Sequence, residues 1–521
     1  MEPRSPRLAS RSAGNTNYIL AVDAGTTASK VSLFKENGEL AAISTQEYSL
    51  ITPNSLSVEI EAETIWAAYR QGVFEVLKKS RVNKDEIKAI GISAQGETLI
   101  PIGKDGKPLR NAVVWLDNRA QEEAEVLSKE FDEDGTSFKI TGQVKIVPTW
   151  PASKILWIRR KEPDIFRRTS KYLLLEDYLI YRMTGKCVAE GSLLCSTVYW
   201  NINTRKWWEE MLEMLEITPD QLPEIRESGE AVGELLTSTA SELGLSSRTI
   251  VTTGALDQAA GATGVGNIKP GMFSENTGAA LAICAPLDNP IFDPQRRMPV
   301  HYFVRPASYM AHTFTTGGIV LRWFRDNFCS QEMNVGATTG VDPYDILGKE
   351  AEMVAPGCEG LRMLPHLQGA MAPEVNPKAR GVFYGFTLRH AKPHFVRAIM
   401  ESVIFIVRRN MEILEDMGIH VSEIRSLGGG ARSRIWKQIE ADITQKPVYT
   451  MKNKEAACLG AAILAGKAVG LYGSIDEACE KMIRVEERFN PNPANFNTYE
   501  SSYRNYVQLY DDLCSMFERE Q

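Results

Sequence analysis

Runs of apolar residues near the start of the chain predict a strand, a tight turn and a second strand over residues 18–34. Four apolar residues lead into Asp23, and alternating apolar positions resume at Val31 and Leu33. Gly25 stands in the turn, where the lack of a side chain lets the backbone approach a polyanion closely. The pattern therefore indicates a hairpin whose tip could grip phosphate.

The polar residues of this tip carry the same indication. Thr26 and Thr27 offer hydroxyl and N–H groups to phosphate oxygens, and Asp23 is a carboxylate placed to hold a cation or its waters. An ordinary β-hairpin with a polar tip is the alternative. The segment alone does not decide between the two.

The apolar pattern continues in an order that is typical of nucleotide-binding cores. A third strand is predicted over residues 40–48, an amphipathic helix over 61–79 and a short buried strand over 87–93. This β-β-β-α-β order is the one found in cores of the ribonuclease-H/actin type.

Two further strands, residues 99–102 and 112–115, are predicted to pair across a turn at residues 104–108. Polar groups cluster at the strand ends: Gln95, Gly96, Glu97 and Thr98 before the first strand, and Trp115, Asp117, Asn118 and Arg119 after the second. An aromatic face beside donors and acceptors suits a small polyhydroxylated ligand. A core tryptophan with a surface Asp–Arg ion pair is the alternative. Because so many polar groups flank strands that look buried, the ligand interpretation is favoured.

The next stretch, residues 120–245, is predicted to be mostly helical, with helices over 121–131, 149–160, 173–184 and 206–215. A strand over 249–253 then runs into Asp257, and a helix begins with Gln258. Open α/β sheets bind ligands at the carboxyl ends of their strands. Aspartate is also a common helix N-cap, and on position alone the N-cap interpretation is favoured for Asp257.

After a crossing segment at residues 264–272, the hairpin pattern returns. Residues 273–283 again read strand, Thr-Gly turn and strand, with Thr277 and Gly278 in the turn. Two such hairpins facing one another across a cleft can hold the two ends of a triphosphate. The duplication favours phosphate binding over an ordinary hairpin.

Glycine-rich turns precede two helices of the second half. Gly318 comes just before a predicted helix over 319–327, whose N-terminus suits an anion. Gly429 and Gly430, with Ser433, join a strand at 424–427 to a helix at 435–444, where bare backbone lets a base or ribose lie close. Neither this turn nor residues 460–467 has the Walker A spacing. A small-residue helix over 456–469 is suited to close packing behind a nucleotide.

Composition and charge limit the classes of function. The chain has 521 residues, 43% hydrophobic and 24% charged, which suits two or three globular domains. A net charge of −7 argues against a nucleic-acid or anionic-membrane partner. No apolar run is long enough to span a membrane. Eight scattered cysteines without a CxxC pair predict neither a zinc site nor disulfides, and therefore a cytoplasmic location. All six histidines lie at or beyond His301, so chemistry in the first 300 residues relies on other groups.

Four of these segments together resemble the FGGY carbohydrate kinases, from Tyr18 to about Tyr499. They are the DAGTT hairpin, VVWLDNR, GALDQAAGATGVG and SLGGGARSRIWKQIEADIT with the alanine-rich helix after it. The GGGARS form and the Trp323-Phe324-Arg325 helix look most like xylulose kinases.

The resemblance implies two ribonuclease-H-like lobes of the actin/hexokinase superfamily, with ATP and Mg²⁺ in the cleft between them and a sugar or polyol as acceptor. The expected division is a disordered leader at 1–17, an N-terminal lobe at 18–266, a C-terminal lobe at 267–475 and a helical tail at 476–521. Relatives also make a homodimer the expected assembly.

The resemblance also implies roles for single residues. Asp257 becomes the general base, which reverses the preference for an N-cap. Asp23 is expected beside magnesium. The residues expected to bind ATP are Thr26, Thr27, Thr277, Gly278, Gly318, Gly429, Gly430 and Ser433. Those expected to bind the substrate are Gln95, Gly96, Glu97, Trp115, Asp117, Arg119, Asp257 and Gln258.

One departure bears on the acceptor. Xylulose kinases typically carry Met-His-Gly where this chain has Ala94-Gln95-Gly96, and residues 95–98 look like the Gln-Arg-Glu-Thr of glycerol kinases without its arginine. A ketopentose such as xylulose is the first expectation, and a polyol or other short acceptor is the alternative. A nucleotide-binding regulator and an actin-like ATPase are the competing classes. Intact Asp23 and Asp257 argue against the first, and the substrate-side residues argue against the second.

Overall fold

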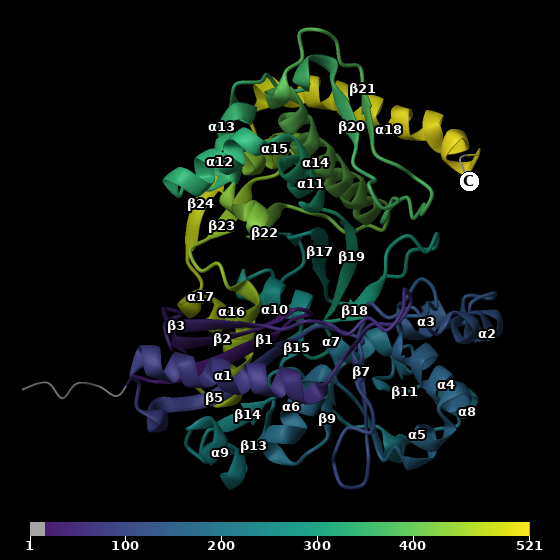
Figure 1. Ribbon diagram of the computed structural model, residues 1–521, viewed down its shortest axis with the longest axis vertical. Helices are drawn as coiled ribbons and strands as arrows, with labels where there is room; N and C mark the ends of the chain where they lie inside the picture. The colour runs from purple at the N-terminus through teal and green to yellow at the C-terminus, as the bar shows by residue number, and fades with distance from the viewer. Residues whose placement is uncertain (1–15, 520–521) are drawn as a thin grey trace, which may run out of the picture.

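The computed structural model describes residues 16–519 and divides them between two α/β lobes, one above the other in Figure 1. The expected two-lobed α/β architecture is confirmed. Most of the predicted leader, residues 1–15, lies outside the described residues. None of the helices within residues 16–519 is both long and apolar enough to cross a membrane.

A seven-stranded sheet forms the centre of the first lobe, in the order β13-β14-β5-β1-β2-β3 with β15 also paired to β5. Its strands are β1 (Tyr18–Ala24), β2 (Ala28–Lys35), β3 (Leu40–Glu47), β5 (Ile87–Ala94), β13 (Ala231–Glu234), β14 (Ile250–Thr252) and β15 (Ala255–Leu256). The predicted hairpin is present, because β1 pairs antiparallel with β2 while its other edge pairs parallel with β5. Helix α1 (Ala62–Ser80) packs against β2 and β3.

A smaller sheet in the same lobe, in the order β4-β7-β6-β8, carries the segments expected around the acceptor. Its strands are β4 (Glu59–Ile60), β6 (Leu99–Ile102), β7 (Ala112–Val113) and β8 (Lys171–Leu174). The predicted pairing across the turn at 104–108 is confirmed, since Leu99 pairs antiparallel with Val113. Two short strand pairs complete the strands of this lobe: β9 (Val188–Glu190) with β12 (Glu224–Arg226), and β10 (Trp200–Asn201) with β11 (Lys206–Trp207).

The other helices of the first lobe surround these sheets. They are α2 (Gln121–Phe131), α3 (Thr136–Thr141), α4 (Pro151–Lys161), α5 (Pro163–Arg168), α6 (Leu175–Thr184), α7 (Gly191–Leu194), α8 (Glu209–Leu215), α9 (Thr237–Leu243) and α10 (Asp257–Gly264). Two helices begin later than the sequence predicts, because β8 and β11 occupy the first residues of the stretches expected to be helical. A short buried apolar run such as residues 172–174 does not distinguish a strand from a helix by periodicity.

The second lobe repeats the arrangement of the first around β16. Its sheet has the order β18-β19-β17-β16-β22-β23-β24, in which β16 pairs antiparallel with β17 and parallel with β22, as β1 does with β2 and β5. The strands are β16 (Met272–Thr277), β17 (Ala280–Leu287), β18 (Val300–Tyr302), β19 (Tyr309–Thr316), β22 (Glu423–Gly428), β23 (Val448–Met451) and β24 (Val485–Phe489). The predicted second hairpin is therefore confirmed.

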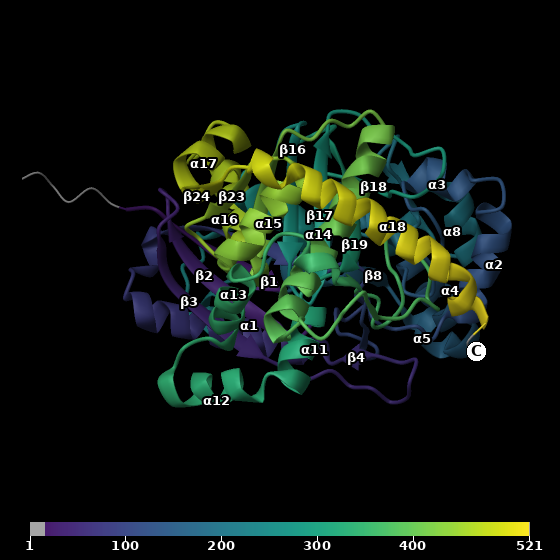
Figure 2. The same cartoon turned by 90° about the horizontal axis from the view of Figure 1, so that it is seen from above.

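Helices and one small strand pair cover the second sheet. They are α11 (Ile319–Phe328), α12 (Ser330–Thr339), α13 (Pro343–Glu352), α14 (Lys392–Asp416), α15 (Arg434–Thr444) and α18 (Phe496–Arg519), with β20 (Arg362–Leu364) pairing β21 (Val382–Tyr384). Figure 2 shows α18 running across the top of this lobe. The expected tail at 476–521 is not wholly helical, because β24 lies within it and forms an edge of the sheet.

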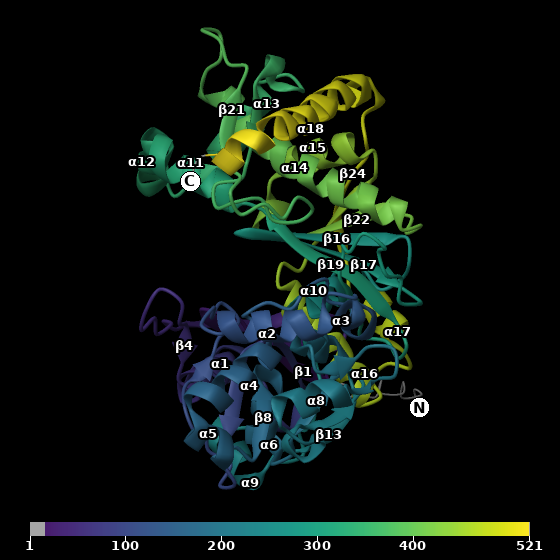
Figure 3. The same cartoon turned by 90° about the vertical axis from the view of Figure 1, so that its right-hand side faces the viewer.

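Two neighbouring helices from the second half of the chain return to the first lobe, where α17 (Ile475–Met482) packs against α16 (Ala456–Ala468) and shares its apolar core. Helix α16 packs against α10, β5 and β1, and Figures 1 and 3 show it beside α10 at the junction of the lobes. The approach is too close for side chains: a Cβ at Gly460 would lie 1.8 Å from the carbonyl oxygen of Ala260, and one at Gly264 would lie 1.9 Å from that of Ala456. The small residues of α16 therefore join the two lobes.

Candidate functional site

The tip of the first hairpin lies at the carboxyl ends of β1 and β5. Asp23 and Ser93 stand opposite each other in this parallel pair, and the Ser93 hydroxyl donates a 2.8 Å hydrogen bond to Oδ1 of Asp23. Burial raises the pKa of Asp23, while Ser93 and the nearby Lys30 ammonium oppose this shift. Lys30 is itself paired with Glu455, which immediately precedes α16, at 2.9 Å. The hairpin is thus tied to the chain that returns from the second lobe.

Thr26 connects this tip with the segments expected around the acceptor. Its hydroxyl donates to Oε1 of Gln95 at 3.0 Å and accepts from Nε1 of Trp115 at 2.8 Å. The neighbouring Thr27 is exposed. The structure therefore brings Thr26, Gln95 and Trp115 together, whereas their separation in the sequence gave no direct sign of contact.

A hydrogen bond from a buried lysine fixes the turn that follows Gln95. Glu97 has a left-handed backbone with φ of 57°, and its carbonyl oxygen accepts a 2.8 Å hydrogen bond from Nζ of Lys154 on α4. The same ammonium donates to the carbonyl of Val114, at 3.0 Å. Burial lowers the pKa of Lys154 to about 7. Burial also raises the pKa of the Glu97 carboxyl, which Ser196 and Lys154 partly offset.

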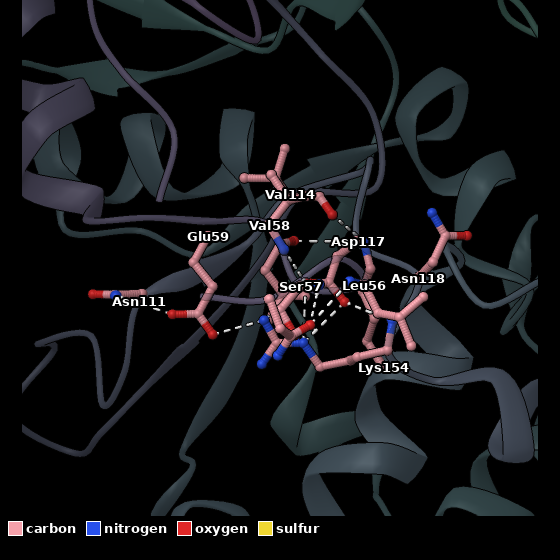
Figure 4. Close-up of polar contacts among 12 residues, drawn as sticks. Leu56, Ser57, Val58, Glu59, Asn111, Val114, Asp117, Asn118 and Lys154 are labelled. Atoms are coloured by element: carbon pink, nitrogen blue, oxygen red, sulfur yellow. Dashed lines mark hydrogen bonds and ion pairs between the residues drawn. The ribbon is translucent and has the colours of Figure 1, made fainter. Parts of the chain in front are cut away.

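Asp117 lies close to this lysine, among residues of the segment 56–59 (Figure 4). It is completely buried, and its Oδ2 accepts a 2.6 Å hydrogen bond from the backbone N–H of Val58. The guanidinium of Arg119 donates to both carboxylate oxygens of Asp117 and to Glu59. It also lies 4.9 Å over the ring of Trp157.

The Asp–Arg pair anticipated as the alternative to ligand binding is thus present, but in the interior rather than at the surface. Both side chains are engaged with protein groups, and the pair fixes the segment 56–59, whose Val58 carbonyl accepts from the N–H of Val114. Direct contact of Asp117 or Arg119 with a substrate stays a prediction.

Asp257 stands where β15 ends and α10 begins. Leu256 holds the N-cap position and Asp257 is the first helical residue, so the N-cap interpretation does not describe this side chain. Burial, reinforced by the negative charges of Asp23 and Glu97, raises the pKa of Asp257 to about 7. A carboxyl poised near neutrality is suited to accept a proton. The next residue, Gln258, accepts a 3.3 Å hydrogen bond from Asn276 of β16.

The second hairpin opens onto a cavity of about 810 Å³, within the usual size range of small-molecule sites. Six residues predicted from the sequence line it together: Thr277, Gly278, Gly318, Gly429, Gly430 and Ser433. Close packing requires a glycine at position 430 of this lining. A Cβ at Gly430 would lie 2.6 Å from Cβ of Thr277, so this turn closes directly against the end of β16.

Sequence reasoning missed several residues of the cavity wall. They come from α11, from the segment before α13, from α13 itself, from α14 and from α15, and include Ile319, Leu321, Arg322, Val341, Asp342, Tyr344, Asp345, Met400 and Trp436. The glycines before α11 gave a signal for that helix, since a helix N-terminus next to a bare turn favours anions. Nothing in the sequence pattern brought α13 to the same cavity.

Behind Thr277 lies a network of charged groups that is fully buried. The Thr277 hydroxyl donates to Glu275. Nζ of Lys437 donates to Glu275 and to Glu440, and both of these Lys437 hydrogen bonds are 2.6 Å long. All three charged side chains have no exposed surface. Burial and the charge of Glu275 raise the pKa of Glu440 to about 8. The network fixes the orientation of the Thr277 hydroxyl.

No group of three or more histidine, cysteine, aspartate or glutamate side chains in residues 16–519 is arranged to hold a metal ion by itself. Magnesium in phosphate-transferring sites usually keeps several waters and binds one or two carboxylates together with substrate phosphates. A single carboxylate such as Asp23, with Oδ1 held by Ser93, fits that mode of binding.

Two family models match the chain over most of its length. The N-terminal domain of the FGGY family of carbohydrate kinases matches residues 18–264, and the C-terminal domain of the same family matches residues 278–469.

Individual proteins are similar to the chain over nearly all of it. A gluconokinase of Bacillus subtilis is 32% identical over 506 residues, covering 97% of each chain, and a xylulose kinase of the same organism is 28% identical, covering 95% of this chain and 96% of its own. A ligand-bound xylulose kinase from Lactobacillus acidophilus has a similar structure, with a TM-score of 0.86, 28% identity and coverage of 97% of this chain and 100% of its own.

Proposed function

Because the chain belongs to the FGGY family of carbohydrate kinases and is an ATP-dependent sugar phosphotransferase, we propose that its acceptor is an uncharged ketose, first of all a ketopentose such as xylulose. The similar proteins include kinases of both xylulose and gluconate, which differ in charge. A polyol or another short uncharged acceptor is the alternative, since residues 95–98 look like the corresponding segment of glycerol kinases.

The charge around Asp257 is the observation that carries this proposal. Asp23 of β1 and Ala255 of β15 both pair with Ser93 of β5, so Asp23, Asp257 and Glu97, which follows β5, lie at the same edge of the sheet. The charges of Asp23 and Glu97 both raise the pKa of Asp257. The neighbouring cations are already bound elsewhere: Lys154 to backbone carbonyls and Lys30 to Glu455.

The guanidinium of Arg119 is likewise already paired, with Asp117 and Glu59. A gluconate carboxylate would bring a further negative charge to a site whose nearby cations are occupied, and like charges at short range cost several kcal/mol. The hydroxyl groups of a neutral sugar can instead donate hydrogen bonds to these carboxylates.

Residues around the turn at 95–98 supply the other contacts expected of a sugar site. The Trp115 side chain is about one third exposed and offers an aromatic face for the C–H groups of a sugar. Glu97 and the amide of Gln95 supply hydrogen-bonding groups beside it. We therefore assign the following residues to the acceptor site: Gln95, Gly96, Glu97, Trp115, Asp257 and Gln258. Asp117 and Arg119 hold the segment 56–59 at this site, and we retain the prediction that they also contact the acceptor.

Asp257 is proposed as the general base. A sugar hydroxyl oxygen bonds to the γ-phosphorus, the bond from that phosphorus to the ADP oxygen breaks, and the hydroxyl proton passes to the Asp257 carboxylate. A pKa near 7 keeps a large share of this carboxyl ionised at neutral pH and still basic enough to hold the proton. Positioning of the two reactants supplies most of the remaining acceleration.

The two hairpins are proposed to hold ATP between them. Thr26 and Thr27 would face the phosphates from the first lobe, and Thr277, Gly278 and Gly318 from the second. Gly429, Gly430 and Ser433 border the part of the cavity assigned to adenosine. Magnesium, held through Asp23, would neutralise phosphate charge.

Two further expectations concern the whole protein. All eight cysteines are free, which suits the reducing cytoplasm that we propose as its location. A homodimer stays a prediction.

The test of the proposal is ADP release by the purified protein with ATP and Mg²⁺ across a panel of acceptors. The panel contains ketopentoses, ketotetroses, ketohexoses, pentitols, erythritol and glycerol, with gluconate as the charged comparison. We expect the highest kcat/KM on a ketopentose and at least tenfold less on gluconate. Preference for gluconate would refute the charge argument, and ATP binding without turnover on any acceptor would favour a regulator.

A further inference from the structure

Among the residues that the structure describes, the short strand β15, which leads directly into Asp257, has a strand partner on one side only. Ala255 and Leu256 pair with Ser93 and Ala94 of β5. On this side the chain is fixed by contact, because a Cβ at Gly254 would lie 1.6 Å from the carbonyl oxygen of Ile92. Buried N–H groups need a hydrogen-bond partner, so the other edge of this segment must find one outside the sheet.

Two buried side chains supply those partners. Oε1 of Glu176, at the start of α6, accepts a 2.8 Å hydrogen bond from the backbone N–H of Gly254. The hydroxyl of Ser192, on α7, accepts a 3.0 Å hydrogen bond from the N–H of Leu256. These two acceptors take the place that a neighbouring strand would occupy.

A second carboxylate fixes the serine. The Ser192 hydroxyl donates to Oε1 of Glu190 at 2.8 Å, and the backbone N–H groups of Ser192 and Leu193 also donate to Glu190. The hydroxyl of Ser228 is a fourth donor to this carboxylate. Glu190, Glu176 and Ser192 are all fully buried.

The hydrogen bonds distinguish the protonation states of the two glutamates. Four donors around Glu190 fit an ionised carboxylate, which only accepts. Glu176 accepts one hydrogen bond, and its Oε2 is buried without a partner among the described residues, which fits a protonated acid. Burial raises the pKa of both glutamates. The pKa of Glu176 lies well above its usual value and the charge of Glu190 adds to the shift, whereas at Glu190 the donors from Ser228, Ser192 and Leu193 oppose the effect of burial.

Such a buried arrangement is a poor way to gain stability, because removing polar and charged groups from water is unfavourable unless they serve a specific contact. Here the contacts reach the peptide groups one and three residues before Asp257. Displacing a reacting group by about 1 Å can cost on the order of 100-fold in rate.

We propose that Glu176 and Ser192 are positioning residues that aim the Asp257 carboxylate at the acceptor hydroxyl by holding the backbone N–H groups of Gly254 and Leu256. Glu190 holds Ser192 in the orientation that accepts from Leu256. This inference rests on the proposed role of Asp257 as the base.

The first test compares two serine variants of the full-length protein. Ser192→Ala and Ser228→Ala each remove one hydroxyl donor from Glu190, but only Ser192→Ala also removes the acceptor of the Leu256 N–H. We expect Ser192→Ala to lower kcat about five- to twentyfold, with the KM for ATP changed less than about twofold. Ser228→Ala is expected to keep kcat within about twofold of the unsubstituted protein.

A merely structural role would lower the melting temperature of both serine variants alike and leave their kcat values equal. Equal kcat values for the two variants would therefore overturn the inference.

The second test uses Glu176. Glu176→Gln keeps an oxygen that can accept from the Gly254 N–H and matches the neutral acid in charge, so kcat should stay within about threefold. Glu176→Ala should lower kcat at least about tenfold. If the glutamine variant folds and is as impaired as the alanine variant, the positioning role of Glu176 is wrong. This pair also decides the question if Ser192→Ala does not fold.

Asp257→Asn in the same assay distinguishes the proposed role of Asp257 as the base from the proposed positioning role of Glu176 and Ser192. If it retains turnover, the proposed base is wrong and with it the reason for positioning. If it is inactive while Ser192→Ala and Ser228→Ala behave alike, the base stands and only the positioning inference is overturned.

Discussion

The indole Nε1 of Trp115 donates a 2.8 Å hydrogen bond to the hydroxyl of Thr26, which in turn donates to Oε1 of Gln95 at 3.0 Å. Trp115 comes from the acceptor side of the first lobe and Thr26 from the phosphate hairpin. A substitution at Trp115 can therefore change the orientation of the Thr26 hydroxyl, which is proposed to face the phosphates. The two halves of the site are connected by side chains as well as by the shared sheet.

Trp115→Phe tests this connection, because it keeps an aromatic face and removes only the N–H donor. Losing one hydrogen bond worth about 1 kcal/mol should lower kcat about fivefold, while the KM for the acceptor rises less than about threefold. The matched control is Trp66→Phe, which removes an indole donor to the Glu242 carboxylate, between α1 and α9. Steady-state kinetics check both variants. Equal effects would show that the Thr26 contact has no special role.

Asp257→Asn should abolish nearly all turnover and leave nucleotide binding intact. The amide is close in size to the carboxyl but accepts no proton, and loss of a general base typically costs about 100- to 10,000-fold in rate. Single-turnover kinetics measure the loss, and calorimetric titration with ATP measures binding. A variant that binds ATP and still turns over at a tenth of the normal rate would remove Asp257 from the mechanism.

The pH dependence follows from the raised pKa of the same carboxyl. Burial and the charges of Asp23 and Glu97 raise the pKa of Asp257 to about 7, and a base works only when ionised. As the pH falls below about 7, the protonated share grows and kcat/KM should fall about tenfold per pH unit.

Glu97→Gln removes one of the charges that raise this pKa, so the acid limb should move to lower pH. The measurement is the pH at which kcat/KM falls to half its maximum, because the maximum value itself also reflects contacts of Glu97 with the acceptor. A limb that stays in place, or moves to higher pH, would contradict the assigned cause of the shift.

Gly430→Ala tests the close contact between the glycine turn and β16. An added Cβ would lie 2.6 Å from Cβ of Thr277, whereas one at Gly429 would have its nearest contact 3.8 Å away, at the Thr277 carbonyl oxygen. Neither glycine has the left-handed backbone that would strain alanine by itself. We expect Gly430→Ala to weaken ATP binding at least about tenfold and to lower the melting temperature by several degrees, as overpacking costs about 1–3 kcal/mol. Gly429→Ala should melt within about one degree of the unsubstituted protein. Similar melting temperatures for the two variants would mean that the turn can relax.

Much of the fold could be predicted from the sequence because its repeated unit is local. The two hairpins at residues 18–34 and 273–283 combine apolar strands with a turn of glycine and threonine, and both signals lie within a few residues of each other. Strand β24 was missed because it is a mostly exposed edge strand rich in charged residues, so it lacks an apolar pattern. The return of α16 to the first lobe is a long-range contact that periodicity does not encode.

The residues of the site likewise fall into those that local sequence indicates and those that act through long-range contacts. Gly429, Gly430 and Asp257 stand at a turn or at a strand end, where position and residue type already indicate chemistry. Lys154 lies on the buried face of α4, and its partners are backbone carbonyls that leave no mark in a sequence. Glu176 likewise acts on a backbone N–H of a distant segment. Supporting residues of this kind become visible only once the chain is folded.

Lys154→Met tests whether the buried ammonium shapes the acceptor site. Methionine fills a similar volume but cannot donate, so the carbonyls of Glu97 and Val114 lose a shared partner and the two walls of the site can separate. We expect the KM for the acceptor to rise at least about tenfold, while the KM for ATP changes less than about twofold.

Lys171→Met is the matched control for this prediction. The Lys171 ammonium also donates to a backbone carbonyl, that of Leu222, at 2.7 Å, but it does so outside the acceptor segments. If the control raises the acceptor KM as much as Lys154→Met, the effect comes from general loosening of the lobe. If only Lys154→Met does so, the turn at Glu97 and the strand end before Trp115 depend on one ammonium for their spacing, and that spacing sets which acceptors fit.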